Sequence, residues 1–526
     1  MDWRQVFLAG GVTLSLLGAP TASGESSGGA ATGGTFRVAA VDPGIDPALS
    51  GPSAYVDATC ALLLRDGEKP EVARRPPTVS PDGRTYTFEL RRTFRFSTGT
   101  RVTAAAFAHE IDRVLSPAMA SDAAQYFSDV VGADAVVAGK ATHASGITAQ
   151  GYTLRIRLTH PAPDFPARLT QPYACAVPPA LPATPDAVTA PASGAGPYYV
   201  AEFVRGSKLV LRRNPYYGGS RPRRVGTFVV TIVADNQTSV DMVAANRADW
   251  ADAAPGTAFG LTAEQVKQVH LLTPPSLAMK YLMMNTSRPL FRNNVRLRRA
   301  INFVIDRRSL ARAYSDAPLF SARPTDQYLP PAMPGFRDVH LYPVAAPDVP
   351  RAQSLARGHT RSGRAVLYTP NASPGMAAAA SIKRDLGRIG IAVEVVPLPV
   401  AQFFDRLANL DEPYDLVWVG WQPAFVDPYD VLNSLLDGRQ LALPDNGDYA
   451  RFNSAKYNRL LARAARLRGS ARYRAYGRLD VQLARDAAPL AAGIDIRQSY
   501  LLSRRAGCVH LSPTGYLELA TVCLRG

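Results

Sequence analysis

The chain is poor in side chains that bind metal ions, with four cysteines and seven histidines in 526 residues. No two histidines stand four residues apart, as zinc ligands on a helix do, and no Cys-X-X-Cys pair occurs. The sequence also lacks a phosphate-binding loop with Gly-Lys-Ser/Thr, a Gly-X-Gly-X-X-Gly turn that opens a helix after a strand, and the Gly-X-Ser-X-Gly nucleophile elbow. These absences argue against a metal site, against a bound cofactor and against the common classes of hydrolase.

Long hydrophobic runs are missing too, because no stretch of about 18 or more uninterrupted apolar residues occurs, so we expect no transmembrane segment in the mature chain. The N-terminal apolar run, Val6 to Leu17, follows Arg4 and leads into the small residues Gly18 to Ser23. This order predicts a cleaved signal peptide over residues 1–23, with a fraying N-terminal helix as the alternative. No cysteine stands directly after the run, so a lipid anchor is not indicated. We expect an exported protein, either periplasmic or extracellular and associated with the cell surface.

Acidic residues are in the minority, with 43 Asp and Glu against 59 Lys and Arg, for a formal net charge of +16. A nucleic-acid binder usually gathers its basic residues in a stripe interleaved with aromatic residues. Here the arginines are scattered, and the tight groups are short: Arg221, Arg223, Arg224 and Arg296, Arg298, Arg299. We therefore expect a solvated basic surface and no nucleic-acid partner.

The few cysteines are even in number and belong to a chain with an export signal, which favours two disulfides over a metal site. Cys508 and Cys523 flank a Pro-Thr-Gly turn and are predicted to pair with each other. That pairing leaves Cys60 with Cys175 as the second disulfide. Four buried free thiols remain the alternative.

Strands and helices are mixed along the chain. Residues 24–34 are rich in Gly, Ser, Ala and Thr and predict a flexible linker before a folded body that starts near Thr35. Apolar and polar residues alternate over 86–90 and 152–158, which predicts half-buried strands, and a helical spacing predicts a helix over 103–115. Beyond residue 280, predicted strands at 281–285, 365–368, 392–397 and 414–420 alternate with predicted helices at 294–314, 374–389, 455–467 and 471–487. This order predicts an α/β lobe rich in parallel strands.

The best candidate site is the end of the apolar strand at 414–420, where Gly420 stands between Trp418 and Trp421 and is followed by Gln422, Pro423 and Phe425. The carboxyl ends of α/β strands commonly bind ligands, although aromatic residues there are often part of the core. The nearby Asp415, Asp427 and Asp430 are better explained by helix capping than by acid–base catalysis. The sequence thus favours a binding protein over an enzyme.

Four blocks of sequence, in order along the chain, are similar to the extracellular solute-binding proteins of family 5, the dipeptide- and oligopeptide-binding components of ABC importers. The blocks are residues 79–91 with 94–99 and 102–104, residues 194–199 with 211–217, residues 281–285 with 295–302 and 305–307, and Gly420-Trp421 with Asp427-Pro428.

The resemblance implies a two-lobed α/β periplasmic-binding-protein fold of type II, with an extra subdomain in the first lobe and the ligand cleft between the lobes. The first lobe would span 35–275 and the second 276–490, and a segment over 491–526 would return to the first. It also implies ABC permease and ATPase subunits as partners of a monomeric binding protein. The segment Gly51–Tyr55 matches the family's first-lobe ligand strand. The expected ligand-binding residues are Ser53, Tyr55, Trp418, Gly420, Trp421, Gln422 and Phe425.

The chain departs from the family at one position. In its peptide binders an aspartate a few residues after the Gly-Trp pair holds the ammonium group of the peptide, and here Ala424 occupies that position. A buried ammonium without a carboxylate partner is costly, so the ligand could be a blocked peptide, a sugar or another small amphiphile. The nickel binders of the family are a minor alternative, because no histidine falls in the second-lobe ligand strand.

The leading hypothesis is therefore a non-enzymatic protein that delivers a peptide-like small ligand to an ABC importer by closing its lobes. The first alternative is a sensory or chaperone-like ligand receptor without transport. An exported hydrolase is a third possibility, since catalytic triads assemble from residues that are distant in the sequence.

Overall fold

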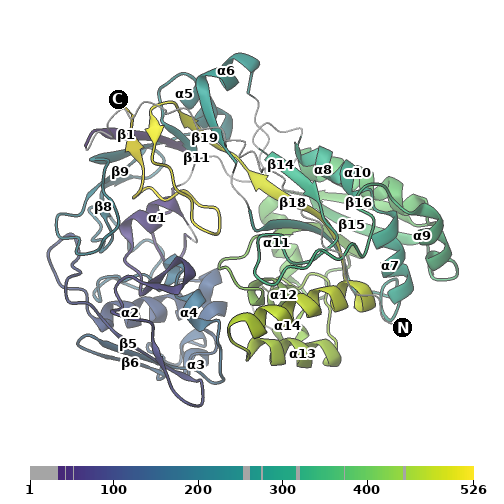
Figure 1. Ribbon diagram of the computed structural model, residues 1–526, viewed down its shortest axis with the longest axis horizontal. Helices are drawn as coiled ribbons and strands as arrows, with labels where there is room; N and C mark the ends of the chain where they lie inside the picture. The colour runs from purple at the N-terminus through teal and green to yellow at the C-terminus, as the bar shows by residue number, and fades with distance from the viewer. Residues whose placement is uncertain are drawn as a thin grey trace, which may run out of the picture.

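The computed structural model describes residues 33–41, 43–50, 53–252, 261–273, 276–315, 320–371, 373–441 and 446–525. The predicted signal peptide and nearly all of the predicted linker lie outside the described residues. The described chain forms two lobes that lie side by side, with the N-terminal half in one and residues of the C-terminal half in both (Figure 1). This arrangement confirms the two-lobed α/β fold.

The first lobe is built on a seven-stranded sheet. In spatial order its strands are β12 (Val269–Leu272), β19 (Tyr500–Ser503), β11 (Trp250–Asp252), β1 (Thr35–Ala40), β10 (Thr227–Ile232), β9 (Lys208–Arg213) and β8 (Tyr198–Val204). β1 runs parallel to β10 and β11, and the other pairs are antiparallel. The helices of this part are α1 (Ala54–Thr59), α5 (Asn236–Ala244) and α6 (Ala263–Gln268).

A four-stranded antiparallel sheet forms a separate subdomain of the first lobe. Its elements are β4 (Thr78–Val79), β5 (Thr85–Glu89), β7 (Thr153–Arg157), β6 (Ile147–Gln150), and the helices α2 (Ala104–Leu115), α3 (Ala133–Val137) and α4 (Phe165–Arg168). Phe88 pairs across the sheet with Leu154, and both side chains are fully buried. The alternating apolar and polar residues over 86–90 and 152–158 are thus those of strands in a half-buried sheet. A two-stranded sheet, β2 (Leu64–Arg65) with β3 (Lys69–Pro70), lies between the two parts in sequence.

The second lobe contains a six-stranded sheet. In spatial order its strands are β14 (Phe320–Pro324), β18 (Leu490–Gln498), β13 (Ala278–Met284), β17 (Leu416–Trp421), β15 (Arg364–Pro370) and β16 (Ala392–Leu398). Its helices are α7 (Val295–Val304), α8 (Arg307–Ser315), α9 (Val349–Ala356), α10 (Ser373–Gly387), α11 (Val400–Ala408), α12 (Tyr429–Leu436), α13 (Ala455–Ala465) and α14 (Gly469–Gln482). Among the described pairings only β15–β16 and β15–β17 are parallel, so the expectation of a parallel-rich lobe is wrong. Strands β14 and β18 are far apart in sequence, and their pairing is invisible to local periodicity.

The single helix predicted over 294–314 is two helices, α7 and α8. The chain leaves the helical conformation at Ile305, with φ −64° and ψ 124°. Asp306 then accepts hydrogen bonds from the backbone N–H of Ser309 at 3.0 Å and from its hydroxyl at 2.7 Å. An aspartate that caps the next turn in this way starts a new helix, although the apolar spacing continues across the break.

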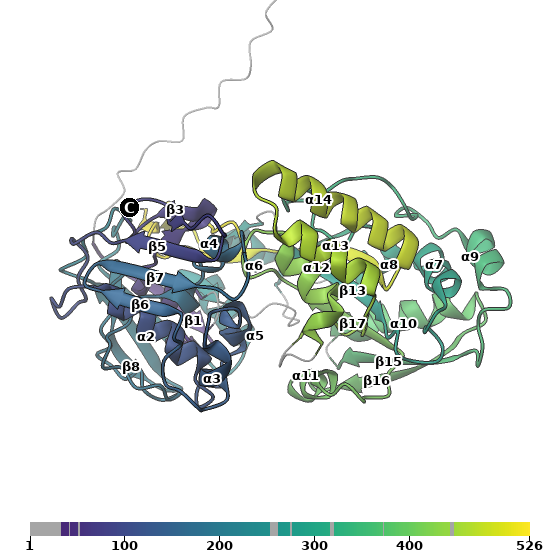
Figure 2. The ribbon, with the colours of Figure 1, turned by 90° about the horizontal axis from the view of Figure 1, so that it is seen from below.

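The chain crosses between the lobes twice, and Figure 2 shows α6 at the boundary between the two lobes. The first crossing lies between β12 and β13, and the second lies between β18 and β19. β18 belongs to the sheet of the second lobe, so the return to the first lobe begins after Gln498 and not at residue 491 as predicted. The final strands, β20 (Ala506–Gly507) and β21 (Cys523–Leu524), pair with each other.

Both predicted disulfides are formed, and no cysteine is free among the described residues. Cys60 at the end of α1 bonds to Cys175, 115 residues away in sequence, and Cys508 bonds to Cys523, 15 residues away. Within the described ranges, no helix is both long and apolar enough to cross a membrane.

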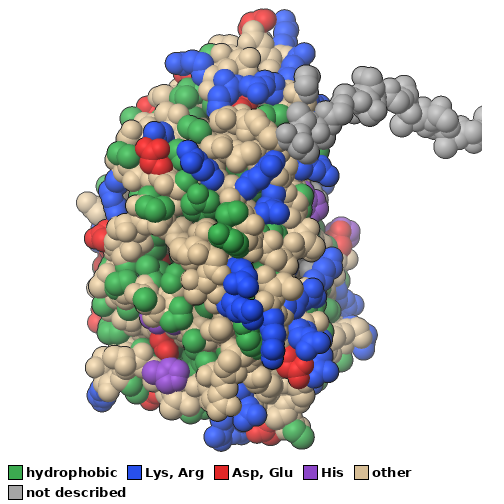
Figure 3. Space-filling view, turned by 90° about the vertical axis from the view of Figure 1, so that its left-hand side faces the viewer, with side chains coloured by type: hydrophobic (Ala, Val, Ile, Leu, Met, Phe, Trp, Pro, Cys, Tyr) green, Lys and Arg blue, Asp and Glu red, His purple; other side chains and the backbone are tan. Residues whose placement is uncertain are grey.

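Lys and Arg side chains are spread over the face of the first lobe among acidic and apolar ones (Figure 3). The two short basic groups are only partly a solvated surface. Arg298 is 4% exposed and donates to the Ala487 carbonyl at 2.8 and 3.0 Å. Burial lowers the pKa of Arg298 to about 10. Arg221 forms a 2.8 Å ion pair with Glu71, so part of the excess positive charge has a structural use.

Candidate functional site in the cleft between the lobes

A cavity of about 670 Å³ lies between the two lobes. The first lobe contributes Glu68, Tyr86, Pro166 and Gln171 to its wall, and the second lobe contributes Phe425, Asp427, Arg472 and Tyr473. The C-terminal segment adds Pro513 and Thr514. The cavity is therefore built from parts of the chain that the fold brings together only when both lobes are in place, which is where a two-lobed protein encloses a ligand.

The lobes touch through side chains beside this cavity and beside a second one of about 300 Å³, which Tyr126, Arg168 and Tyr429 line. The ring of Phe425 meets the ring of Tyr126 edge to face, with centroids 5.9 Å apart and an interplanar angle of 77°. Gln422 Nε2 donates a 3.1 Å hydrogen bond to the carbonyl of Thr514. The guanidinium carbon of Arg168 lies 5.3 Å from the centroid of the Tyr429 ring. Two of the predicted site residues, Gln422 and Phe425, thus make contacts across the cleft.

An ion pair borders the same cavity. Arg472 on α14 forms two 2.8 Å hydrogen bonds with the carboxylate of Asp427, and its Nη2 lies 3.4 Å from Asp164 of the first lobe. Burial raises the pKa of Asp427, although Arg472 opposes the shift, and the two carboxylates hold the pKa of Arg472 well above its usual value. Burial also raises the pKa of Glu68, at the opposite wall. The charge of Asp427 is therefore already matched by Arg472.

The strand β17 carries the predicted site, but its two tryptophans lie in different environments. Trp418 is fully buried among the core residues of the second lobe, and its Nε1–H donates to the Tyr314 hydroxyl at 3.0 Å. Gly493 of β18, two strands away from β17 in the sheet, leaves the space that the Trp418 ring fills, since a Cβ there would lie 2.6 Å from the ring. Trp418 is therefore a core residue, and its predicted place on the cleft wall is wrong.

Trp421, at the end of β17, is only partly buried. Its Nε1–H donates to the Asp430 carbonyl at 2.7 Å, and its ring lies against Gly447, where a Cβ would come within 2.6 Å. Gly420 pairs with Lys280 of β13, whose side chain crosses it. These two residues stand where β17 ends and the loop to Phe425 begins.

In the first lobe, Ser53 and Tyr55 differ in a similar way. The Ser53 hydroxyl caps α1 by accepting from the Tyr55 N–H at 3.3 Å, and Ser53 lines a small pocket of about 40 Å³. That pocket and the larger cavity share Thr170, Gln171 and Thr514, so Ser53 lies next to the cleft. Tyr55 is 2% exposed, and its hydroxyl donates to Asp252 at 2.7 Å, so it supports α1 from within the core instead of facing the cleft.

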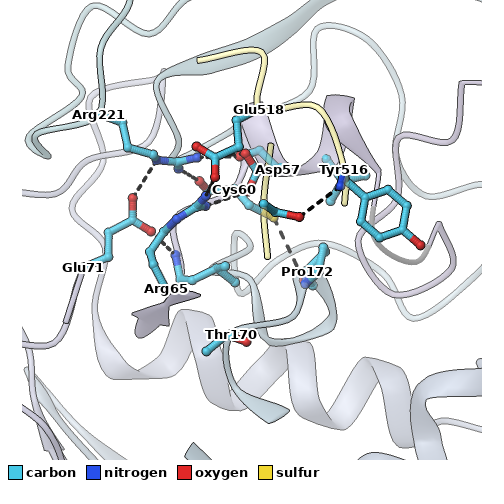
Figure 4. A network of polar contacts seen from close by, with 12 residues as sticks. Asp57, Cys60, Arg65, Glu71, Thr170, Pro172, Arg221, Tyr516 and Glu518 are labelled. Atoms are coloured by element: carbon cyan, nitrogen blue, oxygen red, sulfur yellow. Dashed lines mark hydrogen bonds and ion pairs between the residues drawn. The ribbon is translucent and has the colours of Figure 1, made fainter. Parts of the chain in front are cut away.

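A network of charged side chains contacts α1 and the residue that follows it (Figure 4). Arg65 pairs with Asp57 at 2.6 Å, while Arg221 pairs with Glu71 at 2.8 Å and donates to the Asp57 carbonyl at 2.8 Å. Burial raises the pKa of Asp57, but the guanidinium groups of Arg65 and Arg221 outweigh it and keep the pKa below its usual value. Arg221 also donates to the carbonyl of Cys60. The network and the disulfide together fix the helix that begins at Ser53.

Comparison with known proteins identifies this architecture. The profile of the bacterial extracellular solute-binding proteins, family 5 middle, matches residues 68–442. The chain belongs to this family. It is 26% identical over 395 residues to the probable D,D-dipeptide-binding periplasmic protein DdpA of Escherichia coli (strain K12), covering 73% of this chain and 71% of the relative. It is 24% identical over 428 residues to the periplasmic oligopeptide-binding protein OppA of the same strain, covering 77% and 76%.

Solved structures share the fold. Clavulanic acid biosynthesis oligopeptide binding protein 2 superposes with a TM-score of 0.85 at 23% identity, covering 94% of this chain and 96% of that one. The periplasmic binding protein DppA from Helicobacter pylori, in complex with the peptide STSA, superposes with a TM-score of 0.73 at 19% identity, covering 94% and 99%.

Within this family-5 chain, the aspartates near the strand end support the structure. Asp427 accepts from the Tyr429 N–H at 2.9 Å at the start of α12, besides its pair with Arg472. Asp430 accepts the Ala424 N–H at 2.5 Å and is 1% exposed. These contacts agree with a role at the helix start. Among the described residues, no group of three His, Cys, Asp or Glu is placed to hold a metal ion.

The buried Asp430 gives a pH-dependent prediction. Burial raises its pKa to about 8, despite the backbone N–H groups of Ala424 and Phe425. The pKa of an aspartate in an unfolded chain is about 3.9. The stability that this group contributes is therefore complete below about pH 4 and is lost as the pH rises toward about 8. Urea unfolding at about pH 5 and pH 8 should show the wild type losing on the order of 1 kcal/mol or more per pH unit relative to Asp430→Asn. An equal difference at both pH values would contradict this prediction.

Sequence reasoning missed Tyr126, Asp164 and Arg472, which meet residues of the opposite lobe at the cleft. Arg472 occurs in a stretch of α14 with several other arginines, and nothing in its spacing distinguishes it. The Tyr126 and Asp164 positions belong to the extra subdomain, for which the sequence offered strands and one helix but no site. On this face the sequence pointed only to the end of the apolar strand at 414–420 and, through the family resemblance, to the cleft between the lobes.

Proposed function

We propose that this protein is the extracytoplasmic binding component of an ABC importer, which captures a peptide-like small ligand between its lobes and presents it to the permease and ATPase subunits. It acts as an exported, non-enzymatic monomer. The observation that carries the proposal is the cavity walled by both lobes and the C-terminal segment in a member of family 5. The relatives named as dipeptide- and oligopeptide-binding proteins support the ligand class.

The edge of β17 supports an extended, peptide-like ligand. β15 pairs with β17 only through Leu416 and Val417, so from Trp418 to Trp421 this edge has no strand partner among the described residues. Unpaired backbone groups at a strand edge can bind an extended peptide by adding it as a strand, with side-chain pockets giving specificity. Main-chain recognition of this kind tolerates many ligand sequences.

The loop after β17 does not offer the charge that a free peptide N-terminus requires. Ala424 has no carboxylate, the Asp427 carboxylate is paired with Arg472, and Asp430 is buried with its pKa raised to about 8. An ammonium group enclosed beside these residues would lack an available anion, which is costly. We therefore propose a ligand whose amino end is blocked or held elsewhere.

The test is peptide retention by the purified protein and by Trp421→Ala. Ligand-stripped protein is incubated with a pool of di- to pentapeptides, both free and N-acetylated, and native mass spectrometry reports what stays bound. The wild type should retain peptides, and removing the Trp421 ring should weaken binding by about 2 kcal/mol or more, on the order of thirtyfold. Calorimetry with a retained peptide measures the change.

Tyr216→Ala is the matched control, because Tyr216 is a 50% exposed aromatic residue of the first lobe. It should leave the affinity unchanged. A wild type that retains no peptide from either form of the pool would refute the proposed ligand class. Unchanged affinity in Trp421→Ala, with a normal melting curve, would remove Trp421 from the site.

A further inference from the structure

A lysine lies beside the proposed ligand edge without an acidic partner. Lys280 of β13 is paired in register with Gly420 of β17, and its side chain runs across that glycine. A Cβ at position 420 would lie 3.1 Å from the Cδ, Cε and Nζ atoms of Lys280. Gly420 is thus the residue that admits the lysine side chain to the end of β17, on the face of the sheet that carries Tyr314 and Trp418 and opposite the Trp421 ring.

The ammonium group of Lys280 has little around it that carries negative charge. Its Nζ lies 5.7 Å from the centroid of the Tyr314 ring, and no carboxylate in the described part of the chain forms an ion pair with it. Asp495, on the neighbouring strand β18, stands opposite Met279 and lies 3.7 Å from Arg497. Lys280 is partly buried, and burial lowers its pKa to about 8.

A cation taken out of water without a counter-ion destabilises a protein unless an anion joins it in the working state. The surrounding sheet offers none, and the side chain still reaches solvent. The neighbouring edge of β17 is the one where the proposed ligand would add as a strand. A ligand in that position would bring its own groups within reach of the ammonium.

From this geometry we infer that Lys280 is the anchor for a carboxylate of the bound ligand. The inference rests on the proposed function and names its ligand class: a peptide-like molecule with a free carboxylate at its C-terminus or on a side chain. It fits the loss of a carboxylate at Ala424, because the site then holds an anionic group of the ligand and needs no partner for an ammonium.

Three pools of N-acetylated tripeptides test the inference: C-terminal acids, C-terminal amides without Asp or Glu, and C-terminal amides that contain Asp or Glu. Retention is compared by native mass spectrometry for the wild type, Lys280→Met and Lys280→Arg, after melting curves show that each is folded. The wild type should retain at least one carboxylate-bearing pool on the order of 10- to 100-fold better than the plain amides, since hydrogen bonds to charged groups are strong. The first and third pools distinguish a C-terminal from a side-chain carboxylate.

Lys280→Met should lose this preference while still binding the plain amides, and Lys280→Arg should keep part of it. Retention of all pools without a preference for carboxylates would overturn the inference and leave the proposed function in place. A preference that survives in Lys280→Met would also overturn it. If the wild type retains none of the pools, the inference and the proposed peptide-like ligand both fail.

Discussion

Removing the Cys60–Cys175 disulfide should lower the free energy of unfolding by about 5 kcal/mol, and removing Cys508–Cys523 should lower it by about 3 kcal/mol. The difference follows from loop length, since the first closes a loop across 115 residues and the second across 15. A longer loop loses more conformational freedom in the unfolded chain when it is closed. The double variants Cys60→Ser/Cys175→Ser and Cys508→Ser/Cys523→Ser, unfolded in guanidinium chloride, measure both losses.

Position as well as loop length makes the first disulfide important. Cys60 ends α1, the helix that Ser53 caps, and its carbonyl accepts a hydrogen bond from Arg221. Val56 and Leu62 pack with the two cysteines in a small buried cluster. Loss of this disulfide should therefore also weaken peptide retention. Equal losses of stability in the two double variants would show that loop closure does not set their contributions.

Local patterns in the sequence predicted elements wherever a residue's neighbours in sequence decide its environment. The alternation around Phe88 and Leu154 gave two strands that do pair in the subdomain sheet. Where a single side chain changes the backbone course, the same reasoning failed. Asp306 starts a new helix while the apolar spacing runs on unchanged, so 294–314 looked like one helix.

Only part of the site was predicted correctly, because β17 is apolar throughout. A continuous apolar strand does not indicate which face of the sheet each residue takes, so Trp418 and Trp421 looked equivalent. The structure separates them: Trp418 fills the space beside Gly493 in the core, and Trp421 stands partly exposed at the strand end. The packing that distinguishes them comes from β18, more than 70 residues later in the chain.

The charge pairs at the cleft could not be predicted from the sequence either, because they join residues that are far apart in the chain. Arg472 pairs with Asp427 and approaches Asp164, residues that lie 45 and 308 positions earlier in the chain. Composition gives a net charge of +16 but not which arginine is buried. Lys280 was likewise unremarkable until its register with Gly420 placed it beside the ligand edge.

Replacing Arg472 with methionine should destabilise the protein by about 3–5 kcal/mol, because the buried carboxylate of Asp427 would lose its partner and Asp164 would keep only Arg168. Asp427 is 4% exposed and Asp164 is 1% exposed, so water cannot replace the guanidinium group. Methionine keeps most of the aliphatic volume, which limits the effect to the lost charge and hydrogen bonds. Urea unfolding of Arg472→Met against the wild type at neutral pH gives the magnitude.

Arg468→Met is the control, since Arg468 lines the same cavity but is exposed and should change stability by no more than about 0.5 kcal/mol. The double variant Asp427→Asn/Arg472→Met should recover part of the loss, because it removes the unpaired charge of Asp427, while Asp164 keeps its 2.6 Å ion pair with Arg168. Since Arg472 contacts Asp164 across the cleft at 3.4 Å, Asp164→Asn should in turn weaken lobe closure, which small-angle scattering detects as a larger radius of gyration. Wild-type stability in Arg472→Met would contradict this prediction and would show that the ion pair does not stabilise the folded protein.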